Sequence, residues 1–173
     1  MKCLSKTLAV SLFVAMSITA SADNLLKDAS FSNANGWYCW VEKPALDAGG
    51  SLTLQEGKAV AKSAVVKNQT PSNLQLIKDI NVDADKSYKV KFKANSDKAG
   101  VLTVTYILSK APYTGYACAT INLEPGEKEY ECTLAVKNDK DGKINALRSL
   151  RMFFGAFKDA TVTVSDISFE EVR

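Results

Sequence analysis

The chain has 173 residues, with 22 Lys and Arg against 19 Asp and Glu, and it contains no histidine. The absence of histidine excludes Ser-His-Asp and Cys-His catalysis and histidine-ligated zinc, copper or iron centres. The near balance of charges gives no electrostatic basis for binding nucleic acid or for insertion at an anionic membrane.

The first 22 residues are predicted to be a signal peptide. A short basic start, MKCLSK, precedes the apolar run TLAVSLFVAMSITA, and ASA at positions 20–22 fits a cleavage site. The mature chain then begins near Asp23, and we expect the protein to be secreted or periplasmic. A retained N-terminal anchor is the less favoured alternative, because the apolar run is shorter than the ~20 residues of a membrane span. Cys3 precedes the run, which does not support a lipoprotein anchor.

Residues 23–173 are enough for a single domain with a full core. Apolar and polar residues alternate along much of this length, a pattern typical of strands with one face on a core. The alternating segments are 51–55, 87–94, 100–109, 130–136 and 160–169. Turn sequences such as DAGG, NSDKAG and EPGE separate them, and no convincing amphipathic helix is present. About ten short strands therefore predict an all-β sandwich or barrel.

The segment GWYCW at positions 36–40 contains both tryptophans of the chain. Alternation places Trp37 and Cys39 on the core side of a strand and Tyr38 and Trp40 on the opposite side. An outward tryptophan favours a ligand-contacting role for Trp40. The alternative is that Trp40 lies beneath a loop as peripheral core.

Three cysteines follow the predicted signal peptide: Cys39, Cys118 and Cys132. An exported protein can form disulfides, so one bridge and one free thiol are one interpretation, with three pairings open. Three reduced, half-buried thiols are the other. None of the three belongs to a C-x-x-C pair, which argues against zinc or redox chemistry.

Four segments, in this order, resemble carbohydrate-binding modules of families 4, 9, 16 and 22. They are NLLKDASFSNANGW at 24–37, NLQLIKDINVDADKSYKVKFKANSD at 73–97, INLEPGEKEYECTLAV at 121–136 and FFGAFKDATVTVSDISFEEV at 153–172. The resemblance implies a jelly-roll β-sandwich of two antiparallel sheets, of the galactose-binding-domain-like type. It also implies a ligand cleft on the concave sheet, lined by aromatic and polar side chains.

The same resemblance implies a structural calcium ion near the N-terminal strand, held in part by the glutamate of a Phe-Glu pair and the aspartate of the last strand. In this chain the pair is Phe31-Ser32, so the glutamate is absent. Asp28 and Asp166 remain as candidate calcium ligands. No other cofactor is expected.

Sugar recognition requires aromatic rings for the C–H faces and polar groups for the hydroxyls. Alternation directs some candidates outward, two tyrosines lie beside Pro and Gly at a hairpin tip, and a glutamine occupies the position that the resemblance expects. The predicted ligand-contacting residues are Tyr38, Trp40, Gln75, Thr105, Tyr113, Tyr116, Asn122 and Arg151. The alternatives are a salt-bridged surface arginine for Arg151 and a solvated edge amide for Gln75.

We therefore expect a monomeric, secreted, non-catalytic domain that binds a polysaccharide or oligosaccharide, alone or beside a separate glycosidase. A structural or adhesion β-sandwich without sugar affinity is the main alternative. A glycoside hydrolase or lyase is a remote one. Hydrolysis needs two carboxylates roughly 5–10 Å apart, whereas the acidic residues here cluster in turns.

Overall fold

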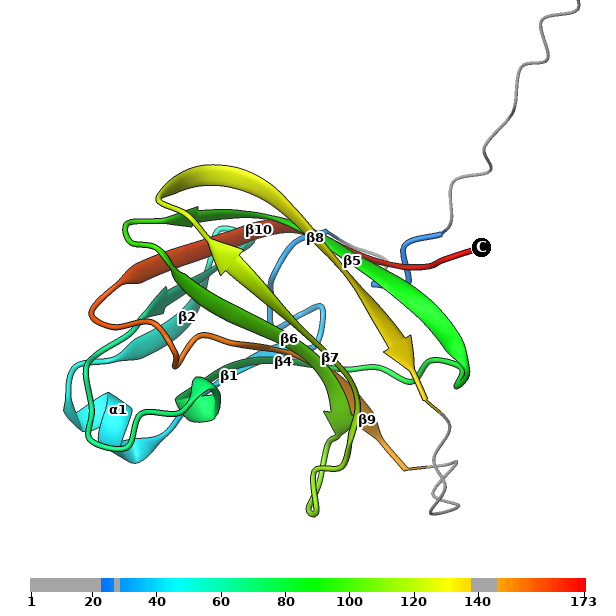
Figure 1. Ribbon diagram of the computed structural model, residues 1–173, viewed down its shortest axis with the longest axis horizontal. Coiled ribbons are helices and arrows are strands. Elements are labelled where there is room, and N and C mark those ends of the chain that lie inside the picture. The colour runs from blue at the N-terminus through cyan, green and yellow to red at the C-terminus, as the bar shows by residue number, and fades with distance from the viewer. Residues whose placement is uncertain (1–22, 27–28, 138–145) are drawn as a thin grey trace, which may run out of the picture.

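Two antiparallel five-stranded sheets pack face to face in the computed structural model, which describes residues 23–26, 29–137 and 146–173 (Figure 1). The first sheet, in spatial order, comprises β1 (Trp37–Val41), β4 (Leu74–Asp79), β9 (Arg148–Phe153), β6 (Gly100–Leu108) and β7 (Gly115–Leu123). The second sheet comprises β2 (Ser51–Gln55), β3 (Lys58–Lys62), β10 (Thr161–Glu171), β5 (Lys86–Ser96) and β8 (Gly126–Val136). The predicted all-β jelly-roll sandwich is confirmed.

Helical structure is confined, within the described residues, to α1 (Lys43–Asp47) and the 3-10 turn η1 (Pro71–Asn73). Each has a proline in its first turn, where the backbone N–H that proline lacks would form no hydrogen bond within the helix. In the same part of the chain no helix has the length and apolarity needed to cross a membrane. The predicted signal peptide lies outside the described residues.

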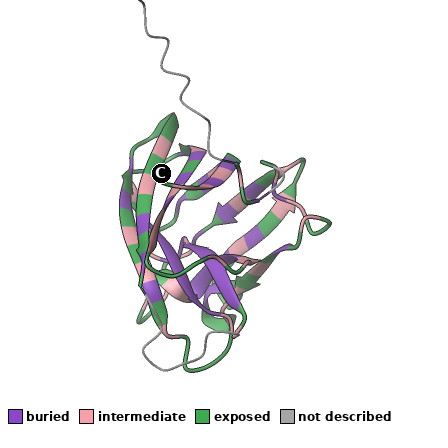
Figure 2. Cartoon of the chain, turned by 90° about the vertical axis from the view of Figure 1, so that its right-hand side faces the viewer, coloured by how far each residue is buried: buried purple, intermediate pink, exposed green. Residues whose placement is uncertain are grey.

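The core forms between the two sheets, and buried positions alternate with more exposed ones along strands such as β5 and β10 (Figure 2). The central strands β6 and β9 of the first sheet are instead buried over consecutive residues. The buried residues of β5 include Tyr88, Val90 and Phe92, and they alternate as predicted for residues 87–94. Trp37 is 1% exposed, and its ring meets Phe31 edge-on with centroids 4.8 Å apart. The inward orientation predicted for Trp37 is confirmed.

The alternation predicted for residues 160–169 is interrupted on β10. The register against β5 shifts between Ser165 and Ser168, and Asp166 has a φ of 51°. As a result the buried residues Val164 and Ile167 are three positions apart rather than two. A β-bulge of this kind adds one residue to a strand and bends it.

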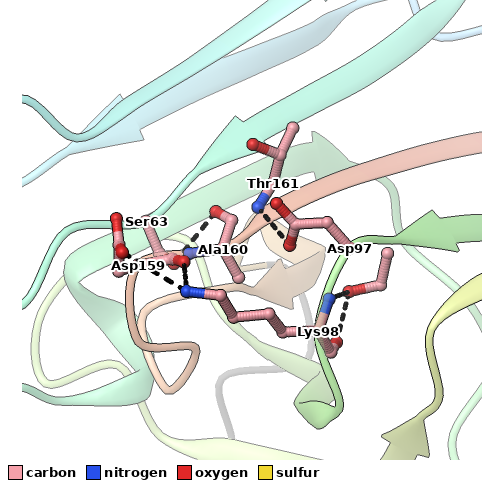
Figure 3. A network of polar contacts seen from close by, with 7 residues as sticks. Ser63, Asp97, Lys98, Asp159, Ala160 and Thr161 are labelled. Carbon is pink, nitrogen blue, oxygen red and sulfur yellow. Dashed lines mark hydrogen bonds and ion pairs between the residues drawn. The ribbon is translucent and has the colours of Figure 1, made fainter.

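Polar contacts join three strand ends of the second sheet at one end of the sandwich (Figure 3). The buried Ser63 hydroxyl donates to the carbonyl of Ala160 at 3.2 Å and accepts from its N–H at 3.1 Å. Asp97 Oδ1 accepts the backbone N–H of Thr161 at 2.9 Å. These bonds hold the segment before β10 to the ends of β3 and β5.

Candidate functional site

Strand order and register gather outward side chains of the first sheet into rows. In one row Trp40 of β1 lies opposite Gln75 of β4, which lies opposite Phe153 of β9. In the next row Ile77 of β4 lies between Tyr38 of β1 and Arg151 of β9. Directly opposite residues have Cβ atoms about 5 Å apart, so each row forms a continuous surface.

These rows form the floor and one side of a cleft of about 620 Å³. Its lining residues are Tyr38, Trp40, Ser72, Gln75, Ile77, Ile107, Ser109, Tyr113, Arg151 and Phe153. A volume of this size lies within the range of small-molecule and oligomer sites in proteins.

Three aromatic side chains flank the cleft and remain accessible to solvent. Tyr38 is 41% exposed, Trp40 is 43% exposed and Tyr113 is 55% exposed. No other Phe, Trp or Tyr in the described part of the chain is exposed to this extent. The outward orientation predicted for Tyr38 and Trp40 is therefore confirmed, and the interpretation of Trp40 as peripheral core is wrong.

Tyr113 reaches the cleft from the loop between β6 and β7, where its backbone adopts a φ of 56°. Its N–H donates to the carbonyl of Lys110 at 3.0 Å, which closes a tight turn. The guanidinium carbon of Arg151 lies 5.4 Å from the centre of the Tyr113 ring, within the range of a cation–π contact. This contact connects the loop to the floor of the cleft.

Arg151 is held in the floor by three hydrogen bonds. Its Nε donates to Ser149 Oγ at 2.8 Å, Nη1 to Gln75 Oε1 at 2.8 Å, and Nη2 to the carbonyl of Ser109 at 3.2 Å. Gln75 in turn donates from Nε2 to the carbonyl of Ser72 at 2.9 Å. Gln75 therefore belongs to a fixed polar network, on a strand inside the sheet, and is not a solvated edge amide.

Asp79, which joins this network through Ser109, affects the ionisation of Tyr38. Asp79 Oδ1 accepts a hydrogen bond from Ser109 Oγ at 2.7 Å. Partial burial, together with the negative charge of Asp79, raises the pKa of Tyr38 above its ordinary value. Burial lowers the pKa of Arg151, but the ordinary pKa of an arginine is so high that Arg151 stays charged at neutral pH. At neutral pH the cleft therefore presents a neutral Tyr38 phenol beside one guanidinium.

The relationship of the chain to known proteins agrees with this geometry. Residues 23–147 match the family model of the carbohydrate-binding domain CBM_4_9. The chain belongs to this family. The resemblance found in the sequence is therefore confirmed, and members of this family are non-catalytic binding domains.

Solved structures support the assignment of the fold. The chain is similar to a CBM4 domain, with a TM-score of 0.63, 19% identity, and coverage of 79% of this chain and 86% of that one. It is also similar to the second N-terminal cellulose-binding domain of β-1,4-glucanase C from Cellulomonas fimi, with a TM-score of 0.59, 18% identity, and coverage of 90% and 98%. A comparison with curated protein sequences gives no match.

The structure does not bring three of the predicted contact residues of this carbohydrate-binding domain into the cleft. Tyr116 is 6% exposed and packs against Tyr106, with ring centroids 6.2 Å apart, so its predicted outward orientation is wrong. The cause is a register shift between Tyr106 and Ile107 in the pairing of β6 with β7, which turns Tyr116 into the core.

The other two lie on the outward face but outside the cleft. Thr105 is directly opposite Arg151, yet it is buried and its hydroxyl donates to the carbonyl of Ala117 at 2.8 Å. Asn122 is exposed on the edge strand β7, opposite Val101 and two strands away from β9. Neither lines the cleft of the domain.

Sequence reasoning did not select Ser72, Ile77, Ile107, Ser109 and Phe153, which complete the lining. Alternation does place the two isoleucines and the phenylalanine on the outward face, so the sequence pattern could have identified them as candidates for the lining. The two serines follow from no local pattern, because Ser72 lies within the short turn η1 and Ser109 directly follows β6.

The calcium ligands expected for the family are not assembled by the described residues. Asp28 lies outside those residues. The Asp166 carboxylate is 3.0 Å from the ammonium of Lys93, and the part of the chain that the structure describes has no group of three or more acidic, Cys or His side chains able to hold a metal. Calcium requires six to eight oxygen ligands. Calcium binding stays a prediction of the resemblance.

The three cysteines of the domain are free thiols in the structure. Cys39 and Cys132 are half-buried, and burial raises the pKa of each to about 11. Cys118 is exposed on β7. Of the two interpretations of the cysteines, the structure has the reduced one.

Proposed function

We propose that this domain binds a polysaccharide or oligosaccharide in the cleft on the outward face of the first sheet. The observation that carries the proposal is that the exposed aromatic side chains of the described residues, Tyr38, Trp40 and Tyr113, all line that one cleft. Exposed aromatic rings on a soluble protein mark interaction sites when they cluster. Their flat faces match the C–H faces of pyranose rings.

In the proposed binding mode, aromatic side chains at the sides of the cleft stack on the sugar and polar side chains in the floor form hydrogen bonds with it. Trp40 and Tyr38 stack on sugar rings from β1, and Tyr113 closes on the ligand from the opposite loop. Gln75 and Arg151 donate hydrogen bonds to sugar hydroxyls from the floor. The bonds that already fix these two side chains reduce the entropy lost on binding.

We also propose that the domain acts outside the cytoplasm after removal of residues 1–22. The basic start, the apolar run and the ASA sequence support this, as does the way the fold begins. Asn24 forms a bridge with Glu170, and Leu25 N–H donates to the carbonyl of Phe169 at 2.8 Å. Both contacts involve residues after Asp23, so cleavage before Asp23 retains them. Mass measurement of the exported protein is expected to place its N-terminus at Asp23.

The experiment that tests the function is affinity gel electrophoresis against glucans, xylans, mannans and galactans, with isothermal titration for each polymer that retards the protein. We expect Trp40→Ala to weaken binding at least about 30-fold, because a central tryptophan in an interface contributes about 2 kcal/mol or more. Tyr113→Ala is expected to weaken it about tenfold.

Leu46→Ala is the matched control, since Leu46 is an apolar side chain, 56% exposed, on α1 and away from the cleft lining. Its affinity is expected to equal that of the unaltered protein. The proposal fails if no polymer retards the protein, or if Trp40→Ala and Leu46→Ala bind equally well. Release of reducing sugar is not expected, because the described residues lining the cleft include no Asp or Glu.

A further inference from the structure

Arg151 has an unusual position for a charged side chain. It is 6% exposed, and it is the one charged residue among the described residues that line the cleft. Removing a cation from water is costly unless a negative group lies against it. The identity of its partners therefore indicates whether the protein itself supplies that negative group.

The three hydrogen-bond partners of Arg151 are all neutral: the Ser149 hydroxyl, the Gln75 amide oxygen and the Ser109 carbonyl. No carboxylate of the described residues lies within 4.0 Å of its guanidinium nitrogens. Asp79 is near enough to act on Arg151 through its charge. However, Asp79 Oδ1 is engaged by the Ser109 hydroxyl.

The lysines on the outward face of the second sheet show the opposite arrangement. Lys89, Lys91 and Lys93 are more exposed than Arg151, yet each has a carboxylate oxygen within 3.0–3.5 Å. These three solvated lysines of β5 therefore each have a partner of opposite charge, whereas the enclosed arginine of the cleft has no described carboxylate within 4.0 Å.

Arg151 also retains donors for a ligand. A guanidinium has five N–H groups, and three are used, which leaves one on each terminal nitrogen. Two N–H groups on the two terminal nitrogens match the two oxygens of a carboxylate, and such charge-assisted bonds are about twice as strong as neutral ones. A hydroxyl would satisfy a donor but not the charge.

We propose that the glycan bound in this cleft carries carboxylates, as in polymers of uronic acids, and that Arg151 binds one of these carboxylates. This inference rests on the proposed function and names the class of sugar that the cleft selects. The neighbouring aromatic rings hold the sugar ring, and the guanidinium supplies the charge that distinguishes an acidic sugar from a neutral one.

The first test compares polymers that differ only at the carboxyl group. Polygalacturonate and alginate are each measured beside the same polymer after chemical reduction of its carboxyls to primary alcohols, by isothermal titration at near-physiological salt. We expect at least one acidic polymer to bind about 10- to 100-fold more tightly than its reduced form, the range for a hydrogen-bonded charge pair. Dextran sulfate is the control for attraction to any polyanion, and it is expected to bind no better than the reduced polymers.

The second test removes the unpaired charge without removing Arg151. Gln75→Glu keeps the shape of the side chain and places a carboxylate where Gln75 Oε1 lies, 2.8 Å from Arg151 Nη1. Because Gln75 also contacts the sugar in the proposed binding mode, the readout is the ratio of the two affinities. We expect the preference of this variant for the acidic polymer over its reduced form to fall about tenfold or more relative to the unaltered protein. Arg151→Gln is expected to bring the two polymers to equal affinity, with its thermal unfolding measured alongside.

Lys91→Gln is the matched control, because it removes the same charge from the opposite face of the sandwich. Equal binding of acidic and reduced polymers, or equal loss in Gln75→Glu and Lys91→Gln, overturns the inference. Binding of a neutral glucan or xylan without preference for acidic polymers overturns it while leaving the proposed function in place. Absence of binding to every polymer contradicts both.

Discussion

The two outward faces of this sandwich have opposite chemistry, although both consist of alternate residues from five antiparallel strands. The face of the second sheet presents charges in rows, with lysines on β5 between acidic side chains on β8 and β10. Its ion pairs include Lys89–Glu131 and Lys91–Glu170. The face of the first sheet presents aromatic rings, isoleucines and one enclosed arginine in a cleft.

The difference between the two faces indicates which of them has a surface suited to a ligand. Exposed ion pairs contribute roughly 0–1 kcal/mol each to stability, so the charges on this face are explained by contact with water and add little to the fold. Exposing aromatic rings to water is unfavourable, so contact with water does not explain why these rings cluster on one face. We propose that the explanation is glycan binding, which agrees with the carbohydrate-binding family to which the chain belongs.

The largest expected effect separates the two sides of strand β1. Trp37→Ala should lower the free energy of unfolding by about 3–5 kcal/mol, because it empties a buried site against Phe31. Trp40→Ala, three positions along the strand and on its outward side, should lower it by less than about 1 kcal/mol. Urea denaturation measures both. A similar loss in the two variants would mean that Trp40 supports the fold, and the contrast between the faces would weaken.

A smaller effect is expected on the charged face. Lys91→Gln removes one partner of an ion pair 3.4 Å long between side chains that stay partly in water. The free energy of unfolding should change by less than about 1 kcal/mol, and by less still at high salt, where such charges are screened. Urea denaturation at two salt concentrations checks this. A loss of glycan affinity in this variant would show that the charged face also takes part in binding.

The smallest effect concerns the edge of the cleft face. At pH 8 iodoacetamide should modify the exposed Cys118 quickly and the half-buried Cys39 and Cys132 slowly. A pKa of about 11 leaves only about one in a thousand of these two thiols ionised at that pH. Peptide mass mapping measures the order. Glycan affinity should stay unchanged after Cys118 is modified, because this residue lies beyond the cleft lining; a large loss would extend the binding surface to β7.

The same two thiols give the stability a defined pH dependence. Their pKa values in the folded state lie above the ordinary value of about 8.5, so folding favours the neutral form. Their contribution is fully present below about pH 8.5 and is lost as the pH rises through about 11.

Local patterns predicted the sandwich well because a period of two is a property of each strand alone. Leu150 and Met152 point inward and Arg151 outward without reference to any other strand. The predictions were wrong where the period is broken. The bulge that turns Tyr116 inward comes from its pairing with β6, and no residue near Tyr116 in the sequence reports that pairing.

The sequence by itself determined the class of fold, the family, and the side of each strand that faces the core. Only the tertiary structure decided which outward residues meet. Gln75 and Arg151 are 76 positions apart and share a hydrogen bond because β4 and β9 are neighbours in the sheet. Tyr113 joins them because the loop after β6 folds back over the floor. Alternation acts over two residues, whereas strand order and register act over the whole chain, and the cleft depends on the latter.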